Sequence, residues 1–375
     1  MWFIIGCFII VFMGAATAAY MVKMKEEFEK FKNKYTTTPP DVDPISDFKD
    51  KDIVKKKEPF VPDEPVVAEI KETELYSYVD SSEKSIYFGN YPQTEIKDET
   101  LIMELNKKAG TLPNKENTYN WIDYDYYVRG KIKSYMYYID IKLDGNKYRG
   151  VYFTRYRPYD TTTDSNTYQD NNGYSIKTTY WFKYEKVKWN ILKTENGKAL
   201  IVSDLILDSQ DYYYSESLRS DATDYQGNTT TSTVYANNYM YSHIREWLNE
   251  TFYDATFNAS EKGIIETTTV DNSAATTSSG SNIYACSNTN DKMFLLSYQD
   301  YTTYSVLSGT TALQGTDYAK SQGLYVSSGN SYNWLRSPFN VVNYRAMRVG
   351  NNGNIGNSSV YDTSTGVRAA CWINL

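Results

Sequence analysis

The sequence predicts an α+β head, built mostly of short antiparallel strands with two or more short helices and preceded by an N-terminal transmembrane helix. Three observations favour this class. The 375 residues include 38 Tyr against 14 Phe and 7 Trp, and tyrosine suits half-exposed strands. Short aromatic runs are separated by Gly, Asn and Asp, which mark turns. Residues 2–22 carry no charged side chain, and about 20 apolar residues span a bilayer.

Composition excludes several classes of protein. Lys and Arg total 39 and Asp and Glu total 46, so the net charge is −7, and such an acidic chain is not expected to bind nucleic acid. A single histidine, His243, and three cysteines exclude His-rich or Cys-rich zinc sites. We expect His243 to be an exposed or locally hydrogen-bonded surface residue. We also expect no enzymatic activity, no cofactor and no bound metal.

The first 75 residues are expected to lie outside the folded head. Residues 1–22 are interpreted as a membrane anchor, residues 23–35 as a short charged helix and residues 36–75 as a Pro-rich stalk, since charged, Pro-spaced sequence buries no core. A signal peptide is the alternative, because Ala16-Thr17-Ala18 fits a cleavage site, and cleavage of residues 1–18 would give a secreted protein. The lysines after the anchor oppose an outward head by the positive-inside rule. We nevertheless predict a membrane-anchored protein with its head exported to the cell surface.

Within the head, residues 76–375, turn signals and apolar spacing predict the elements in order. A strand is expected at 86–89 and two hairpins are expected around Asp144-Gly145 and Asn196-Gly197. Ser242 is a candidate N-cap for a helix, and a second short helix is expected between Thr316 and Gly323. The apolar stripe of the first helix consists of Ile244, Trp247, Leu248 and Phe252.

Two polar stretches, 160–173 and 271–290, are expected to be loops. Asp160, Asp164 and Asp170 lie in the first, and three carboxylates on one loop can gather calcium. Acidic residues in loops are more often simply solvated, so we do not expect a calcium site there.

Several sequence motifs follow one another in an order that is typical of a domain family. They are Phe-Gly-Asn-Tyr-Pro-Gln at 88–93, Val-Lys-Trp-Asn-Ile-Leu at 187–192, Ser-His-Ile-Arg-Glu-Trp-Leu-Asn at 242–249, Asp-Lys-Met-Phe-Leu-Leu-Ser at 291–297, Tyr-Asn-Trp-Leu-Arg-Ser-Pro at 332–338 and Gly-Val-Arg-Ala-Ala-Cys-Trp-Ile-Asn-Leu at 366–375. Together they resemble an uncharacterised bacterial domain family whose fold is C-type-lectin-like, distantly similar to the sulfatase-modifying-factor fold. The resemblance covers roughly residues 85–375, with residues 97–179 as an insertion or elaboration. The family usually has proline after Arg368, where this chain has Ala369.

Four residues in the last motifs are interpreted as structural. Trp334 and Trp372 are spaced as core residues of short strands. Arg336 and Arg368 stand beside apolar positions, and a partly buried arginine needs carboxylate or carbonyl partners.

Residues 339–365 are the candidate ligand-binding segment. Asn, Tyr, Ser, Asp and Gly dominate it, which is the composition of an adaptable binding face. It resembles the variable region of proteins that are diversified by retroelements; the alternative is an ordinary loop in an Asn-rich and Tyr-rich chain. The predicted ligand-binding residues are Asn340, Asn343, Tyr344, Arg345, Arg348, Asn352, Asn354, Asn357, Ser358, Tyr361 and Asp362.

These features predict a receptor-like or adhesin-like protein that binds an unknown extracellular protein or glycan. Two alternatives stay open. One is an oxidase related to formylglycine-generating enzymes, with Cys286 and Cys371 binding copper, although nothing in their flanks lowers a thiol pKa. A disulfide between these two cysteines is also left open. The other alternative is a structural envelope protein whose head packs against its neighbours.

Overall fold

The computed structural model describes residues 79–80, 85–128, 131–163, 168–304 and 313–375. These residues all belong to one compact unit, Pro65–Leu375. The short charged helix and the stalk predicted at 23–35 and 36–75 lie outside the described residues.

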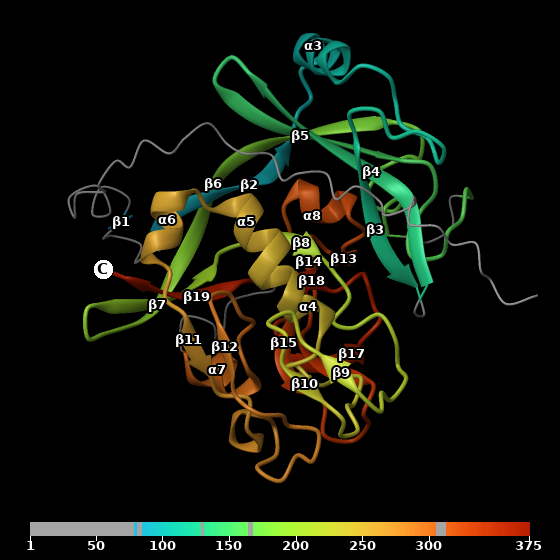
Figure 1. The fold of residues 1–375 in the computed structure, drawn as a ribbon. Helices are drawn as coiled ribbons and strands as arrows, with labels where there is room; N and C mark the ends of the chain where they lie inside the picture. The colour runs from blue at the N-terminus through green and yellow to red at the C-terminus, as the bar shows by residue number, and fades with distance from the viewer. Residues whose placement is uncertain (1–78, 81–84, 129–130, 164–167, 305–312) are drawn as a thin grey trace, which may run out of the picture. The chain divides into compact units, whose positions relative to one another are not determined.

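The larger sheet has eight strands in the order β1-β2-β6-β5-β4-β3, with β7 beside β6 and β19 beside β7, and every pairing is antiparallel (Figure 1). Its strands are β1 Val79–Asp80, β2 Ser85–Glu95, β3 Ile122–Val128, β4 Lys131–Leu143, β5 Asn146–Phe153, β6 Thr179–Glu195, β7 Lys198–Ser203 and β19 Ala370–Asn374. Because β3, β4 and β5 come from residues 97–179, the region expected to be an insertion is part of this sheet.

Both predicted hairpins are confirmed, and their turns explain why. The β4–β5 turn has φ of 49° at Asp144 and 76° at Gly145, and the β6–β7 turn has φ of 53° at Asn196 and 73° at Gly197. Two successive positive φ values match the twist of antiparallel strands, and Asn, Asp and Gly adopt them most readily. Short local signals therefore set the register of the long central strands.

A second sheet of five strands has the order β17-β16-β15-β18-β8, in which only the β15–β18 pairing is parallel. Its strands are β8 Asp208–Ser209, β15 Asn333–Pro338, β16 Arg345–Val349, β17 Ile355–Ser359 and β18 Gly366–Val367. Three small pairs complete the strands: β9 Ala222–Thr223 with β10 Thr229–Thr230, β11 Thr268–Val270 with β12 Thr289–Asp291, and β13 Val326–Ser327 with β14 Asn330–Ser331.

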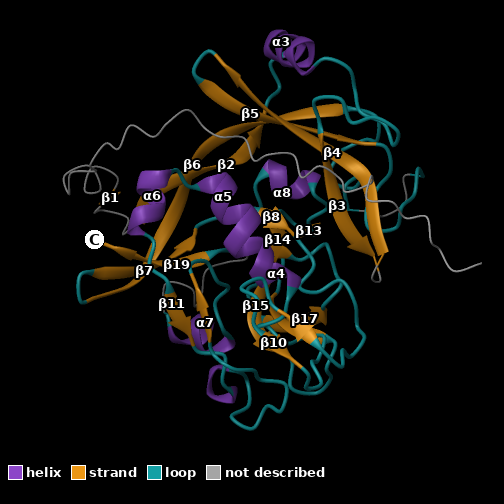
Figure 2. Ribbon diagram, viewed as in Figure 1, coloured by secondary structure: helices purple, strands orange, loops and turns teal. Residues whose placement is uncertain are grey.

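The helices are short (Figure 2). They are α3 Glu99–Ala109, α4 His243–Trp247, the π-helical turn η1 Leu248–Phe252, α5 Tyr253–Thr256, α6 Ala259–Ile264, the 3₁₀ turn η2 Ala274–Thr276, α7 Tyr298–Thr303 and α8 Asp317–Ser321. The predicted caps are confirmed, since Ser242 accepts from the amide of Arg245 and Thr316 from that of Ala319.

The larger sheet separates two hydrophobic cores. Successive residues of a strand point to opposite faces, so in β6 Trp181 belongs to a smaller core beneath α3 whereas Phe182 belongs to the main core. The main core is shared with α4, η1, α5 and the second sheet. Figure 1 shows α3 on one side of the larger sheet and the other helices on the opposite side.

The predicted fold class is wrong. Antiparallel sheets dominate the described residues, in place of an α+β, C-type-lectin-like fold with a transmembrane helix. Ser, Thr and Asn are plentiful, and they favour caps, turns and strands over helix interiors. The predicted anchor is corrected too: none of the helices in the described ranges has the length and apolar character to cross a bilayer. The predicted span itself, 1–22, lies outside those ranges.

Candidate ligand-binding site

The predicted binding segment, 339–365, forms β16, a turn and β17. Arg345 Nη1 donates to Asn357 Oδ1 at 2.9 Å, and Arg348 Nε donates to Ser358 Oγ at 2.8 Å. The β16–β17 register runs without a bulge, so the neighbours 357 and 358 point to opposite faces of the sheet. The structure thus divides these four predicted residues between two faces.

The remaining predicted residues lie around this hairpin. Asn340, Asn352 and Asn354 are exposed in the flanking turns. Asn343 is half-buried, and its carbonyl accepts a backbone hydrogen bond. Tyr344 is half-buried and packs against the main core. None of these five residues lines the cleft described next.

Tyr361 and Asp362, the last two predicted residues, line a cleft of about 600 Å³. This volume lies in the range of small-molecule sites, about 300–1,000 Å³. The cleft, here called the tyrosine cleft, is lined by Lys133, Pro158, Tyr159, Asp160, Tyr168, Ser359, Tyr361, Asp362, Thr363 and Ser364. It therefore joins the predicted segment to β4 and to the chain between β5 and β6.

Buried polar residues hold the wall that carries Tyr159 and Tyr168. Arg157, only 1% exposed, donates through its guanidinium to carbonyl oxygens of β8 and of the residue after α8. Gln169 is fully buried, accepts from the Arg157 amide at 2.9 Å and donates to a carbonyl of α8 at 2.8 Å. A backbone bridge closes the turn 156–161, which leaves Tyr159 65% exposed at its tip.

The opposite wall is held by the carboxylate of Asp362. Its Oδ1 accepts from Ser364 N at 2.9 Å and from Ser364 Oγ at 2.6 Å, and its Oδ2 accepts from Thr365 Oγ1 at 3.3 Å. The carbonyl of Val360 accepts two backbone amides from the segment after β8. The turn that presents Tyr361 is thus fixed on both sides.

Of the acidic residues that line the tyrosine cleft, Asp160 is paired with basic residues, whereas, within the described ranges, Asp362 accepts hydrogen bonds from neutral donors only. Lys133 Nζ lies 3.1 Å from Asp160 Oδ2, and Arg155 Nη1 lies 3.5 Å from Asp160 Oδ1. Burial and the nearby charge of Asp362 raise the pKa of Tyr168, so its phenol is protonated at neutral pH and can donate a hydrogen bond.

A row of aromatic side chains continues from the cleft along the surface. Tyr168 meets Tyr325 edge-on at 5.5 Å between ring centroids, and Tyr325 stacks on Tyr332 at 4.4 Å with 19° between the planes. The guanidinium carbon of Arg348 lies 3.5 Å from the Tyr332 centroid, within the range of a cation–π contact. This aromatic row links the predicted residue Arg348 to the tyrosine cleft.

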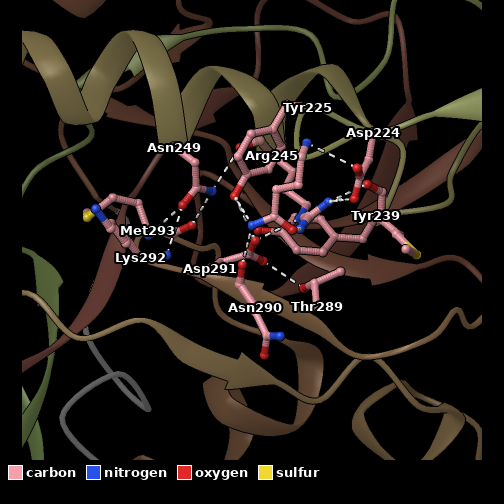
Figure 3. A network of polar contacts seen from close by, with 12 residues as sticks. Asp224, Tyr225, Tyr239, Arg245, Asn249, Thr289, Asn290, Asp291, Lys292 and Met293 are labelled. Atoms are coloured by element: carbon pink, nitrogen blue, oxygen red, sulfur yellow. Dashed lines mark hydrogen bonds and ion pairs between the residues drawn. The ribbon is translucent and has the colours of Figure 1, made fainter. Parts of the chain in front are cut away.

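A second polar group, the Arg245 cluster, is buried beneath α4 (Figure 3). Arg245 is 1% exposed; its Nε lies 2.8 Å from Asp291 Oδ1 and its Nη1 lies 3.0 Å from Asp224 Oδ2. Its guanidinium also lies 4.7 Å from the Tyr225 ring centroid. Burial lowers the pKa of Arg245, but the charge of Asp291 and the hydrogen bond to Asp224 raise it overall. The donors and acceptors meet inside the protein, which is the arrangement of a structural network.

His243, at the start of α4, is paired with an acidic residue. Its Nδ1 lies 3.2 Å from both carboxylate oxygens of Asp211, which is 3% exposed. Burial lowers the pKa of His243, but the charge and hydrogen bond of Asp211 raise it overall. The histidine is half-buried beside a hollow of about 220 Å³.

The two cysteines of the oxidase alternative are free, so the disulfide left open by the sequence is not formed. Burial raises the pKa of Cys286 to about 11 and raises that of Cys371 as well, whereas a reactive thiol needs a lowered pKa. Within the described ranges, no three His, Cys, Asp or Glu side chains are grouped to hold a metal. Asp164 of the calcium hypothesis lies outside those ranges.

The residues predicted to be structural lie in or against the main core. Trp334 is 1% exposed and donates to a backbone carbonyl at 2.8 Å, and Trp372 packs against the core from β19. Arg336 donates to a carbonyl at 2.9 Å and to Asp300 Oδ2 at 2.6 Å. Arg368 donates to a carbonyl at 2.7 Å, and burial lowers its pKa to about 10.

Sequence reasoning missed Lys133, Pro158, Tyr159 and Tyr168 as cleft residues and considered Asp160 only as a calcium ligand. Ser359, Thr363 and Ser364 lie within the predicted segment but were not among its predicted contacts. Tyr159 follows a proline and precedes an aspartate, which indicates an exposed turn. That signal predicts an exposed turn, but it does not predict which residues lie near the turn in the fold. The turn meets residues 359–364 through a long-range contact, which no local sequence pattern predicts.

Comparison with known proteins covers only part of the chain. Residues 196–375 match the model of a family described as a domain of unknown function (DUF6273), which agrees with the expected resemblance to an uncharacterised domain. Neither a curated protein nor a solved structure matches the chain. Neither a lectin-like fold nor a retroelement link is shown. The matched part includes the Tyr361 wall of the tyrosine cleft, whereas the Tyr159 wall lies outside it.

Proposed function

We propose that this protein is a ligand-binding protein and that the tyrosine cleft receives the ligand. The observation that carries the proposal is the meeting of Tyr361 and Asp362, predicted from the sequence, with Tyr159 and Tyr168 around one cleft of about 600 Å³. Tyrosines give rigid contact area and hydroxyl groups at low entropic cost. Both walls are held by internal hydrogen bonds, so the cleft is preorganised, which lowers the cost of binding.

The proposal predicts that cleft ligands raise the melting temperature of the full chain. A ligand at a hundred times its Kd stabilises a protein by about 2.7 kcal/mol, which corresponds to a rise of several degrees. We would screen neutral sugars, amino acids, organic ions and short peptides by thermal unfolding. The stabilisation should disappear in Tyr159→Ala, whose 65% exposure predicts little change in the stability of the free protein.

Tyr119→Ala is the matched control. Tyr119 is also an exposed tyrosine, at 45%, but it does not line the cleft. It should keep the full response to each ligand. If every stabilising compound acts equally on Tyr159→Ala and Tyr119→Ala, the cleft is not the binding site.

Diversification of residues 339–365 by a retroelement is a further proposal. The pairing of Arg345 with Asn357 and of Arg348 with Ser358 ties these positions to the hairpin, so variation should concentrate at Tyr361 and at the exposed Asn340 and Asn354. The test is to read the DNA around the coding region. A near-identical repeat that differs mainly at adenines, beside a reverse transcriptase gene, would support the mechanism; finding neither would exclude it.

A further inference from the structure

We infer that the ligand of the tyrosine cleft is a neutral oligosaccharide. This inference rests on the proposed function and adds the chemical class of the ligand. The cleft offers a ligand aromatic surface, hydroxyl groups and the carboxylate of Asp362, which neutral donors of the protein already hydrogen-bond.

The charged groups of the cleft already have partners. Asp160 faces Lys133 at 3.1 Å and Arg155 at 3.5 Å. Asp362 accepts two hydrogen bonds from Ser364 and one from Thr365. A charged ligand would have to be desolvated, and an anionic one would also be repelled by the carboxylate of Asp362. A neutral ligand avoids both costs.

The groups that remain match the two kinds of surface on a sugar. A pyranose ring has a face of weakly positive C–H groups, which pack on the negative face of an aromatic ring, and an edge of hydroxyl groups. Tyr159 leaves most of its side chain open for such a contact. The protonated phenol of Tyr168 and the hydroxyl of Ser359 stand beside it for hydrogen bonding.

The aromatic row explains why we infer an oligosaccharide. From Tyr168 the row continues through Tyr325 to Tyr332, with centroids 5.5 Å and then 4.4 Å apart. All three side chains are half-buried. Stacking and Arg348 cover the faces of Tyr325 and Tyr332, so the row offers a ligand ring edges and hydroxyl groups. Further sugar units that extend from the cleft can form hydrogen bonds there.

The test is titration of the full chain with neutral tetrasaccharides, namely the malto-, cello-, chito- and manno- forms, followed by calorimetry. At least one should bind with a Kd in the millimolar range or better. Tyr159→Ala should weaken this binding at least about tenfold, whereas Tyr159→Phe, which keeps the ring, should stay within about threefold. Raising the ionic strength from about 0.1 M to about 1 M should change the Kd less than about twofold, because no ion pair forms. Far-ultraviolet circular dichroism checks that each variant is folded.

Charged probes separate the inference from the proposed function. Polygalacturonate, polylysine and a mixed-sequence decapeptide are titrated in the same way. If one of these binds with dependence on Tyr159 and no neutral tetrasaccharide does, the cleft is a binding site but its ligand is not a neutral sugar. Equal losses in Tyr159→Ala and Tyr159→Phe would overturn the stacking argument. If no probe binds with dependence on Tyr159, both the inference and the proposed function fail.

Discussion

The Arg245 cluster and the tyrosine cleft use the same kinds of side chain for opposite purposes. In the cluster, an arginine 1% exposed is held between two buried aspartates and a tyrosine ring. In the cleft, tyrosines and aspartates line a hollow, and Tyr159 keeps 65% of its surface open. The structural cluster and the candidate binding cleft therefore use the same residue types. They differ in whether the polar and aromatic side chains already contact other parts of the protein.

The largest expected effect comes from breaking the Arg245 cluster. Arg245→Ala leaves Asp224 and Asp291 buried without their cation, which should lower the free energy of unfolding by about 3–5 kcal/mol. Urea unfolding of the full chain measures the loss. A loss below about 1 kcal/mol would show that the cluster is hydrated and would remove its contrast with the cleft.

Arg155→Ala is the control from the cleft side of the comparison. Arg155 also lies near a carboxylate, Asp160, but at 3.5 Å and with 44% of its side chain exposed. Exposed pairs of this kind contribute about 0–1 kcal/mol. The two arginines should therefore differ severalfold in their effect on stability.

Much of the local structure could be predicted because its signals are local. Asp144-Gly145 and Asn196-Gly197 mark their turns whatever surrounds them, and Ser242 and Thr316 cap their helices within three residues. The fold class could not be predicted in the same way. It depends on which strands pair, and the neighbours β7 and β19 stand far apart in the sequence.

In the candidate site, too, the sequence predicts local features but not the contacts between distant segments. The segment 339–365 was found from its composition, but composition carries no information on which face a residue occupies. Arg345 and Arg348 are three residues apart, so on one strand they point to opposite faces. Tyr159 and Tyr168 enter the site only through the tertiary contact between its two walls.

The pair of His243 and Asp211 lies between the two extremes, because His243 is half-buried and can titrate. The pKa of His243 is raised in the folded protein above an unfolded value of about 6.5. The pair therefore adds stability below about pH 6.5, and this stability is lost as the pH rises through the folded pKa. His243→Gln should cost about 1.5 kcal/mol at acidic pH and much less at alkaline pH. Urea unfolding across the pH range measures both, and a cost independent of pH would mean that the histidine acts by packing alone.

The smallest expected effect concerns Arg348 and Tyr332. It tests most directly whether the aromatic row belongs to the binding surface or only stabilises the fold. Their contact of 3.5 Å lies at the surface end of the aromatic row, so a double-mutant cycle of Arg348→Met and Tyr332→Leu should give a coupling of only about 0.5–1 kcal/mol in unfolding. The cycle is needed because Arg348 also donates to Ser358, and each single variant therefore mixes two losses. The same cycle can be run on the Kd of a cleft ligand. Coupling in both stability and affinity would mean that the row extends the binding surface, whereas coupling in stability alone would assign Arg348 to the structural group that Arg245 represents.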